Sequence, residues 1–316
     1  MSTTWPTLDY GAWRDTALTL HLWAQIVGKV RLAFTPWLNH GWHVPLYVTA
    51  HGLGTSAIPG ARGLLEIEFD FAAQRLIVRS SEGPDRGFAL EPMTVATFYR
   101  RTLAELEAAG EPVRIVARPN EVPEPIAFAD DDTHRSYDAA AVHRFWRALV
   151  EVDRVLKRFR TAFLGKSSPV HLWWGSFDLA VTRFSGRRAP PHPGGIPGLP
   201  DAVTREAYSH EVSSAGFWPG SDAYPHAAFY AYAYPSPAGY ESAHIEPAEA
   251  TWVAALGEWI LPYDVVRASP DPAATLMRFL ETTYRAAAGL AQWDPSLECA
   301  LGEPRRPRVV PTNTAR

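Results

Sequence analysis

The stretch LEIEFDF, residues 65–71, alternates apolar and acidic side chains without interruption. An extended strand places successive side chains on opposite faces, so this alternation predicts a β-strand with one buried face. The segment AQRLIVRS, residues 73–80, predicts its hairpin partner, and AAFYAYAY, residues 227–234, predicts a further alternating strand. Three tyrosines of that strand share one face: Tyr230, Tyr232 and Tyr234.

Four long helices are predicted alongside these strands, each from apolar residues that recur at helical spacing. Asp9 is a suitable N-cap for the first helix, and Thr35-Pro36 ends it. Gly110 stands where a helix commonly ends on a glycine in left-handed conformation. The predicted helices cover residues 9–34, 94–109, 138–163 and 272–290, and further strands are expected at 39–52, 113–117, 168–186 and 205–212.

These elements predict an α+β fold, mainly antiparallel sheet with packed helices, in two similar halves. Each half reads helix, strand, strand, helix, and the acidic, proline-bearing connector 118–134 separates them. The halves span residues 1–134 and 135–303, and residues 304–316 are expected to form a disordered tail.

An internal duplication is one explanation for the similarity of the two halves. Aligning WHVPLYVTAHGL with VHLWWGSFDLAVTRF sets His43 opposite His171. In that case the two sheets could pair about a pseudo-two-fold axis and leave a shared cleft between them. A chance similarity is the alternative, and the sequence leaves both open.

The composition limits the class of protein. The chain has 316 residues, a net charge of -4 and one cysteine, Cys299, so we expect no internal disulfide, no cysteine-based zinc site and no nucleic-acid partner. It has no run of about 20 apolar residues and no secretory signal, which predicts a cytoplasmic protein without a membrane span. Glycine motifs that bind phosphates or dinucleotides are absent from the sequence, so no nucleotide cofactor is expected.

Two histidines that are close in sequence form a candidate metal site. His40 and His43 stand three residues apart in a segment that a turn could curl. Two neutral imidazoles with one carboxylate suit iron, zinc, copper or nickel, so a bound transition metal is one hypothesis. Histidines that bind backbone groups at a wet edge of the sheet would give the same pattern.

The segment YSHEV, residues 208–212, carries the candidate catalytic groups. As a strand it would place Tyr208 and His210 on one face and Glu211 on the other. Histidine titrates near neutral pH, so His210 is the candidate general acid/base, with Tyr208 and Glu211 as its partners. The alternative is a polar strand near the surface, in which Glu211 pairs with an arginine such as Arg183.

Substrate-binding residues are expected among aromatic and charged side chains of the predicted strands. Asp178 and Arg183 interrupt an apolar run, and a charge in such a run usually has a specific partner. Arg183 could clamp a carboxylate or phosphate with two parallel hydrogen bonds, whereas a buried salt bridge is the structural alternative. The remaining candidates for a ligand pocket are His51, His171, Trp173, Trp218, Tyr230 and Tyr232.

Four long strings of the sequence carry a resemblance to a known family. They are TLHLWAQIVGKVRLAFTPWLNHGWHVPLYVT (19–49), SPVHLWWGSFDLAVTRFSGR (168–187), REAYSHEVSSAGFWPG (205–220) and AFYAYAYPSP (228–237). Together they resemble a bacterial family of unknown function, the domain of unknown function 5996, over nearly the whole chain. The resemblance implies no activity and no catalytic residues, so the candidate sites rest on side-chain chemistry.

Three functional hypotheses follow from these patterns. The first is an enzyme that acts on a small aromatic or acidic molecule in a cleft between the halves, lined by His, Tyr and Trp. The alternative is a non-catalytic protein that binds a small molecule, or a scaffold in a bacterial pathway. The third places the strand 227–234 at an exposed sheet edge, where it would pair two subunits into a homodimer.

Overall fold

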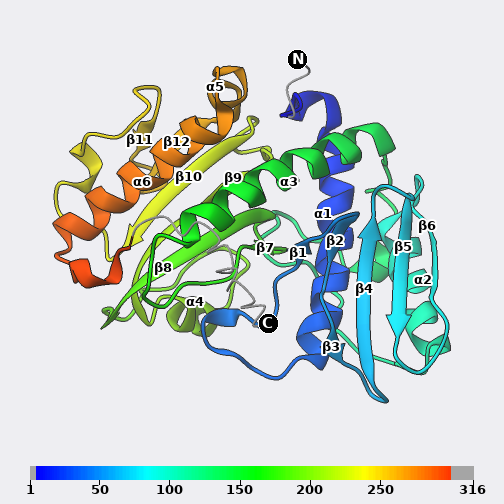
Figure 1. Ribbon diagram of the computed structural model, residues 1–316. Helices are drawn as coiled ribbons and strands as arrows, with labels where there is room; N and C mark the ends of the chain where they lie inside the picture. Colours follow the sequence, from blue (N-terminus) through cyan, green and yellow to red (C-terminus); the bar gives the residue numbers. More distant parts are fainter. Residues whose placement is uncertain (1–4, 300–316) are drawn as a thin grey trace, which may run out of the picture.

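The computed structural model describes residues 5–299 of the chain. The described residues form six α-helices and four short 3₁₀ helices around two antiparallel sheets (Figure 1). The α-helices are α1 (Tyr10–Phe34), α2 (Val95–Ala108), α3 (Ala139–Arg160), α4 (Asp201–Ala207), α5 (Tyr263–Ala268) and α6 (Pro272–Leu290). The 3₁₀ helices are η1 (Asn39–Gly41), η2 (Phe128–Asp130), η3 (Tyr240–Ser242) and η4 (Pro295–Leu297).

The N-terminal sheet has the strand order β1-β2-β4-β5-β6, with β3 paired to β4 beside this path. Its strands are β1 (Tyr47–Val48), β2 (Gly52–Gly54), β3 (Ile58–Pro59), β4 (Leu64–Asp70), β5 (Arg75–Ser80) and β6 (Arg86–Ala89). The C-terminal sheet has the order β11-β12-β10-β9-β8-β7. Its strands are β7 (His171–Trp173), β8 (Asp178–Arg188), β9 (His210–Trp218), β10 (Ala228–Tyr234), β11 (Thr251–Val253) and β12 (Glu258–Pro262).

The two sheets meet edge to edge at a single bridge. The backbones of Leu46, beside β1, and Leu172, in β7, exchange two hydrogen bonds of 2.9 and 2.8 Å. Both leucine side chains are fully buried. The edge strands of the two sheets therefore cover each other at this point, and the halves share one seam.

The helices cover one face of each sheet. α3 and α6 lie across the same face of the C-terminal sheet, and α1 runs between the two sheets (Figure 1). On the N-terminal side Trp23 of α1 stacks on Phe98 of α2 at 4.6 Å, and Phe98 stacks on Phe69 of β4 at 5.9 Å. One hydrophobic cluster includes residues from both halves, so a common core holds them together.

Several predictions are confirmed. α1, α2, α3 and α6 agree with the predicted helices within a few residues, and the Asp9 side chain caps α1 by accepting a hydrogen bond from the Gly11 N–H. The alternating stretches 65–71 and 227–234 form β4 and β10. The α+β class is therefore right. The internal duplication is not confirmed, because the two sheets differ in strand order although both halves run helix, strands, helix.

Three predicted strands are wrong because each range contains a turn or a change from helix to strand. The range 39–52 contains η1, then β1, and ends at the first residue of β2. His40 in η1 adopts a positive φ of 58°, and the Thr49 hydroxyl oxygen accepts a hydrogen bond from the Gly52 N–H in the turn between β1 and β2. The range 168–186 is a hairpin whose turn separates β7 from β8. The range 205–212 is the end of α4 followed by the start of β9.

Two further expectations fail. Residues 113–117 form no strand. Strand β10 lies inside the sheet between β9 and β12, so it offers no free edge for the proposed pairing of two subunits. The predicted tail 304–316 lies outside the described residues.

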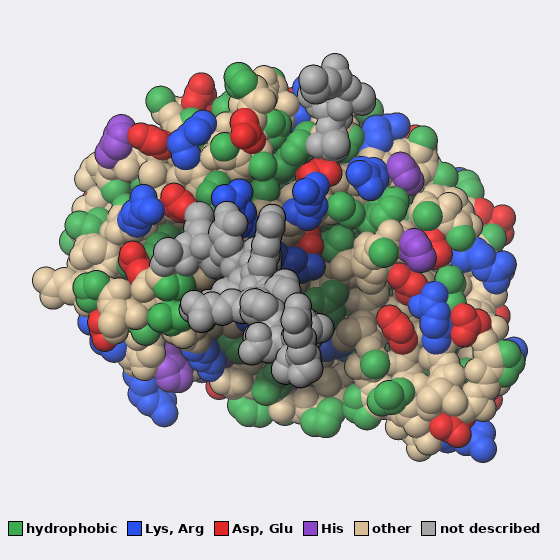
Figure 2. All heavy atoms as spheres, in the orientation of Figure 1, with side chains coloured by type: hydrophobic (Ala, Val, Ile, Leu, Met, Phe, Trp, Pro, Cys, Tyr) green, Lys and Arg blue, Asp and Glu red, His purple; other side chains and the backbone are tan. Residues whose placement is uncertain are grey.

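The helices and the surface charges bear on the expected absence of a membrane span and of a nucleic-acid partner. No helix between residues 5 and 299 combines the length and apolarity that a membrane span requires. Acidic and basic side chains are interspersed over the described part of the face that Figure 2 shows.

Candidate functional site

One face of the C-terminal sheet collects most of the polar and aromatic side chains of its strands. Paired residues of adjacent antiparallel strands share a face, and the register pairs Tyr230 with Gly216 and Tyr232 with Ser214. Alternation along each strand assigns the other members, and we call this side the tyrosine face. Its members are His171 and Trp173 of β7, Asp178, Thr182 and Phe184 of β8, His210, Ser214, Gly216 and Trp218 of β9, Tyr230, Tyr232 and Tyr234 of β10, and Glu258 and Ile260 of β12.

A deeply buried polar pair on the tyrosine face joins Asp178 and Tyr230, each 4% exposed. The Tyr230 hydroxyl donates a hydrogen bond to one Asp178 oxygen, and the Ser176 hydroxyl donates to the other. Tyr230 reaches across β9 because Gly216 has no side chain: a Cβ there would lie 2.5 Å from the Tyr230 hydroxyl oxygen. Burial raises the pKa of Asp178, and the two hydrogen bonds lower it in part.

A second pair of phenols lies further along the same face. The hydroxyl oxygens of Tyr208 and Tyr232 are 2.8 Å apart, and the His192 ring stacks on Tyr208 with centroids 4.9 Å apart. Burial raises the pKa of Tyr208 to about 12. These phenols therefore keep their protons at neutral pH and can donate hydrogen bonds.

Three aromatic rings form a stack over the middle of the tyrosine face. Trp218 stacks on Tyr230 with centroids 4.5 Å apart, and Tyr230 lies nearly parallel to Tyr232 at 6.1 Å. The negative face of such rings attracts a cation, most strongly where water is excluded. The stack therefore offers a surface on which a flat or positively charged ligand could rest.

Two further carboxyl groups lie close enough to Asp178 to feel its charge. Burial, and then the charge of Asp178, raise the pKa of Glu121 to about 7 and that of Glu258 to about 8. One Glu258 carboxyl oxygen is buried and has no hydrogen-bond partner among the described residues. The Glu121 carboxylate lies against Gly175, where a Cβ would overlap it. The site thus gathers three carboxyl groups from three different parts of the chain.

A polar stripe on the buried helix α1 positions Glu121. The Gln25 side chain accepts a hydrogen bond from the Asn120 N–H at 2.7 Å and donates one to the Asn120 carbonyl at 2.8 Å. One turn later Lys29 donates to the Asn120 side chain, and one turn earlier His21 bonds the carbonyls of the β7–β8 turn. Because residues four apart lie on one helix side, this stripe fixes the connector against the sheet.

Most of the binding residues predicted from sequence lie on the tyrosine face. Tyr230, Tyr232 and Trp218 form the aromatic stack, and Tyr208 reaches it from the end of α4. His171 is fully buried there; its Nδ1 bonds the Pro169 carbonyl at 2.7 Å, and burial lowers its pKa to about 4. Trp173 and His210 lie on the same face, away from the stack.

Arg183 lies on the other side of the sheet. Its guanidinium lies over the rings of Phe159, at 3.6 Å, and Tyr284, at 4.2 Å, and it donates to the Phe159 carbonyl. Burial lowers the pKa of Arg183 to about 10. Arg183 therefore cannot contact an anion bound at the tyrosine face. The predicted anion-binding arginine and the predicted acid/base residues do not form one site.

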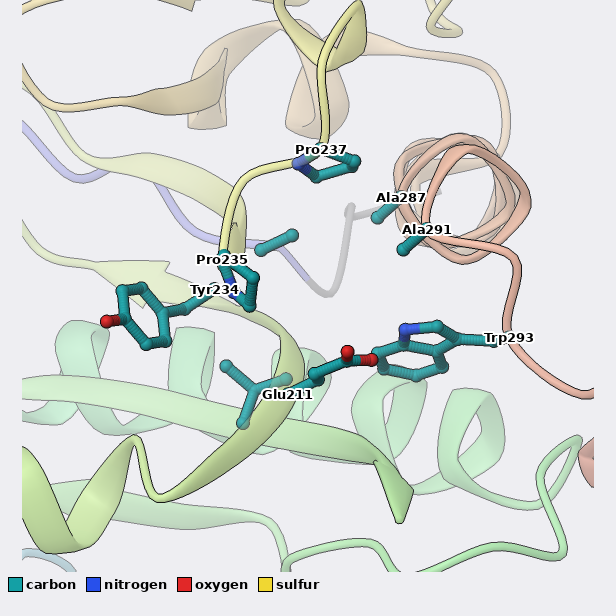
Figure 3. A pocket seen from close by; sticks show the side chains of 9 residues that line it. Glu211, Tyr234, Pro235, Pro237, Ala287, Ala291 and Trp293 are labelled. Carbon is teal, nitrogen blue, oxygen red and sulfur yellow. The ribbon is translucent and has the colours of Figure 1, made fainter. Parts of the chain in front are cut away.

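Glu211 also faces away from the tyrosines, beside a small cavity between β10 and α6 (Figure 3). Its carboxylate accepts hydrogen bonds from Ser185 at 2.8 Å and from two nitrogens of Arg187 at 2.9 and 2.7 Å. The cavity measures about 180 Å³, below the usual 300–1,000 Å³ of small-molecule sites. Figure 3 shows Glu211 beside Trp293, and the ring of Tyr234 pointing away from the cavity. Glu211 thus serves as an ion-pair partner at the end of α6.

The remaining predicted residues do not join the tyrosine cluster. His51 is exposed in the N-terminal half, 3.9 Å from Asp70. His43 bonds the backbone of Leu38, and the Nε2 atom of His40 lies 2.7 Å from the Lys166 ammonium. Among residues 5–299, no three His, Cys, Asp or Glu side chains are grouped in a way that could hold a metal ion. Metal binding stays a prediction without support.

Sequence reasoning missed the acidic members of the site. Asp178 stood out as a charge in an apolar run, but its partner Tyr230 lies two strands away. Glu121 was assigned to a connector between halves, and Glu258 lies in a strand that was not predicted. The polar residues at positions 21, 25 and 29 of an otherwise apolar helix were the available signal for the connector's position.

The whole described chain matches one family model, over residues 5–299, described as a family of unknown function, DUF5996. The chain belongs to DUF5996. The resemblance noted in the sequence is therefore confirmed. No curated protein and no solved structure matches this DUF5996 chain, so its site has to be interpreted from its own geometry.

Proposed function

We propose that the tyrosine face is the active site of an enzyme that binds a small organic amine and moves a proton at it through Glu121. The observation that carries the proposal is the grouping of Asp178, Glu121 and Glu258 around the stacked rings of Trp218 and Tyr230.

The charge of the cluster supports a cationic ligand. No lysine or arginine between residues 5 and 299 is among the groups that set the pKa values of Glu121, Asp178 and Glu258. Buried carboxylates are costly unless they are paired, so burial favours the protonated form of such groups until a cation pairs with them. An ammonium group on the aromatic stack would pair with these carboxylates and receive the attraction of the rings.

The same features support proton transfer. A general acid or base works best when its pKa is near the working pH, and burial brings the pKa of Glu121 to about 7. The Tyr208 and Tyr232 hydroxyls could hold a polar group of the substrate, because they donate and accept hydrogen bonds at the same face. The expected acidic substrate loses support, since Arg183 lies on the opposite side.

Ligand-dependent thermal unfolding tests the proposed specificity. We expect aromatic and aliphatic amines at a hundredfold excess over Kd to raise the free energy of unfolding by about 3 kcal/mol and therefore to raise Tm. Matched neutral alcohols and carboxylates should leave Tm unchanged. The stabilisation should increase from pH 6 to pH 8, because the carboxyl groups of the site lose their protons over this range and can then pair with the ammonium group. Glu258→Gln should reduce it, while Glu211→Gln, on the opposite face, should not. Stabilisation by carboxylates alone would contradict the proposal.

A non-catalytic binding protein is the second candidate, and it uses the same site. NMR spectra of a stabilising amine incubated with the protein separate the two. Conversion, or exchange of a carbon-bound proton with solvent deuterium, with a rate that depends on pH near 7 and is lost in Glu121→Gln, supports the enzyme. Recovery of the unchanged amine, with binding intact, supports the binding protein.

A further inference from the structure

A second cluster of titratable groups lies where η1 and α4 pack together, outside the proposed amine site. The Nζ atom of Lys166 is 2.7 Å from Nε2 of His40, whose side chain is buried. The Nδ1 atom of His40 lies 3.2 Å from the Ala207 carbonyl, which can only accept. Nδ1 therefore carries the proton, and Nε2 presents its lone pair to the lysine.

The surroundings of the pair restrain it. Lys166 is itself exposed, and its Nζ lies 5.2 Å from the centre of the Trp42 ring and 5.4 Å from that of Phe184. The backbone of Lys166 is fixed to β8, because its carbonyl accepts a hydrogen bond from the Phe184 N–H at 3.0 Å. The amine thus stands in solvent contact, between two aromatic walls and beside a buried base.

The other two lysines of the chain lack this combination. Lys29 is 5% exposed and donates to the Asn120 side chain. Lys157 is exposed and forms an ion pair of 2.7 Å with Asp153, which holds its proton. Only Lys166, of the three lysines in the sequence, is both accessible and within hydrogen-bond distance of an imidazole, a partner that does not hold it as an ion pair.

We propose that Lys166 is a nucleophilic lysine that forms an imine with aldehydes or ketones, with His40 as the base that takes its proton. The Nζ lone pair forms a bond to the carbonyl carbon, and the carbonyl π pair moves to the oxygen. His40 Nε2 accepts the two protons of the nitrogen one after the other and returns each of them to the oxygen. The oxygen leaves as water when the C=N bond forms, so no oxidant or reductant is needed.

Charges around the pair support the reactivity of the amine. Burial lowers the pKa of Lys166, and the carboxylate of Glu206 opposes this change. Burial and the lysine charge lower the pKa of His40, to which His210, with its ring 5.6 Å away, also contributes. At a pH well below the pKa of the lysine, lowering that pKa by one unit raises the fraction of free amine about tenfold.

The test uses benzaldehyde and sodium cyanoborohydride, which traps the imine as a stable secondary amine, with peptide mass spectrometry of the whole chain. At pH 7 we expect Lys166 to be labelled about tenfold faster than Lys157, with Lys29 unlabelled. His40→Asn should lower the Lys166 rate to that of Lys157 and leave Lys157 unchanged. Asparagine is the matched replacement, because it tolerates the positive φ of residue 40.

A second measurement keeps the test decisive if the variant fails to fold. The pH dependence of labelling in the unmodified chain should have its midpoint at lower pH for Lys166 than for Lys157. Equal rates and equal midpoints at Lys166 and Lys157 would overturn the proposal. The amine site is tested separately, because Glu258→Gln should not change the labelling of Lys166.

Discussion

Replacing Tyr230 by phenylalanine tests whether the Asp178 pair is the electrostatic centre of the tyrosine face. The change removes one hydroxyl and leaves the ring, its stacking on Trp218 and the strand register in place. Asp178 then keeps the side-chain hydrogen bond from Ser176 but loses the one from Tyr230. A hydrogen bond contributes about 1 kcal/mol when both partners are neutral and about 1.5–3 kcal/mol when one is charged. The loss should therefore depend on whether Asp178 is ionised.

The direction of the pH effect follows from the pKa of Asp178. Burial raises that pKa, so the folded state holds the proton more tightly than the unfolded state, and stability falls as pH rises through the folded pKa. The Tyr230 hydrogen bond limits this fall because it favours the ionised form. Without it, the free energy of unfolding should drop by about 1 kcal/mol at a pH where Asp178 is protonated and by about 2–3 kcal/mol at a higher pH where it is ionised.

Urea denaturation at the two pH values measures the difference. Tyr234→Phe is the matched control, because Tyr234 lies on the same strand and face but donates to the Pro190 carbonyl at 3.0 Å. Its loss should stay below about 1 kcal/mol and should not change with pH. A double-mutant cycle with Asp178→Asn should return a larger coupling energy at the higher pH than at the lower one. Equal losses for Tyr230→Phe at both pH values would refute an ionisable partner.

Three further substitutions test other parts of the site. Glu258→Gln should raise the free energy of unfolding at pH 9 by up to about 5 kcal/mol and leave it unchanged at pH 4, because burial raises the pKa of this group to about 8 and its ionised form destabilises the fold; urea midpoints measure this. Gln25→Ala should lower the free energy of unfolding by about 2–4 kcal/mol, since the backbone N–H and C=O that it binds lose their partners; thermal unfolding measures this. Gly216→Ala should cost about 1–3 kcal/mol by crowding the Leu179 carbonyl oxygen and the Tyr230 hydroxyl, whereas Gly289→Ala, in open space on α6, should be neutral or stabilising in the same assay.

The regular elements of this fold are predictable because their patterns repeat. The strand at 65–71 and the tyrosine strand at 227–234 alternate cleanly, and the long helices have apolar residues at helical spacing with caps such as Asp9. The faces follow from the same alternation, so the grouping of Tyr230 with Tyr232 needed no structure.

The turns were not predicted, although the turn between β7 and β8 contains the turn residues Gly175 and Ser176, because the residues on either side continue the strand pattern. The β7–β8 hairpin turns through Phe177 with a φ of 59°, a conformation that aromatic residues rarely adopt. The sequence therefore reads as one long strand through this turn. The same failure placed Tyr208 and His210 on one strand, although Tyr208 ends α4 and His210 starts β9.

The carboxyl cluster could not be predicted for a different reason. Its members are brought together by contacts between residues far apart in the chain, such as Gln25 with Asn120 and Asp178 with Tyr230. A single sequence contains the alternation within each strand but not the order of strands in the sheet. Glu121 enters the site only because helix α1 holds the connector in place.

The single bridge between Leu46 and Leu172 has a consequence for the order in which the chain folds. Most strands of each sheet pair with a neighbour in sequence, so their loops are short and close early at low entropic cost. The bridge joins residues from opposite halves, so its two hydrogen bonds and the burial of both leucines form only when that long loop closes. Each sheet should therefore form on its own helices before the seam closes, and the common core should consolidate last.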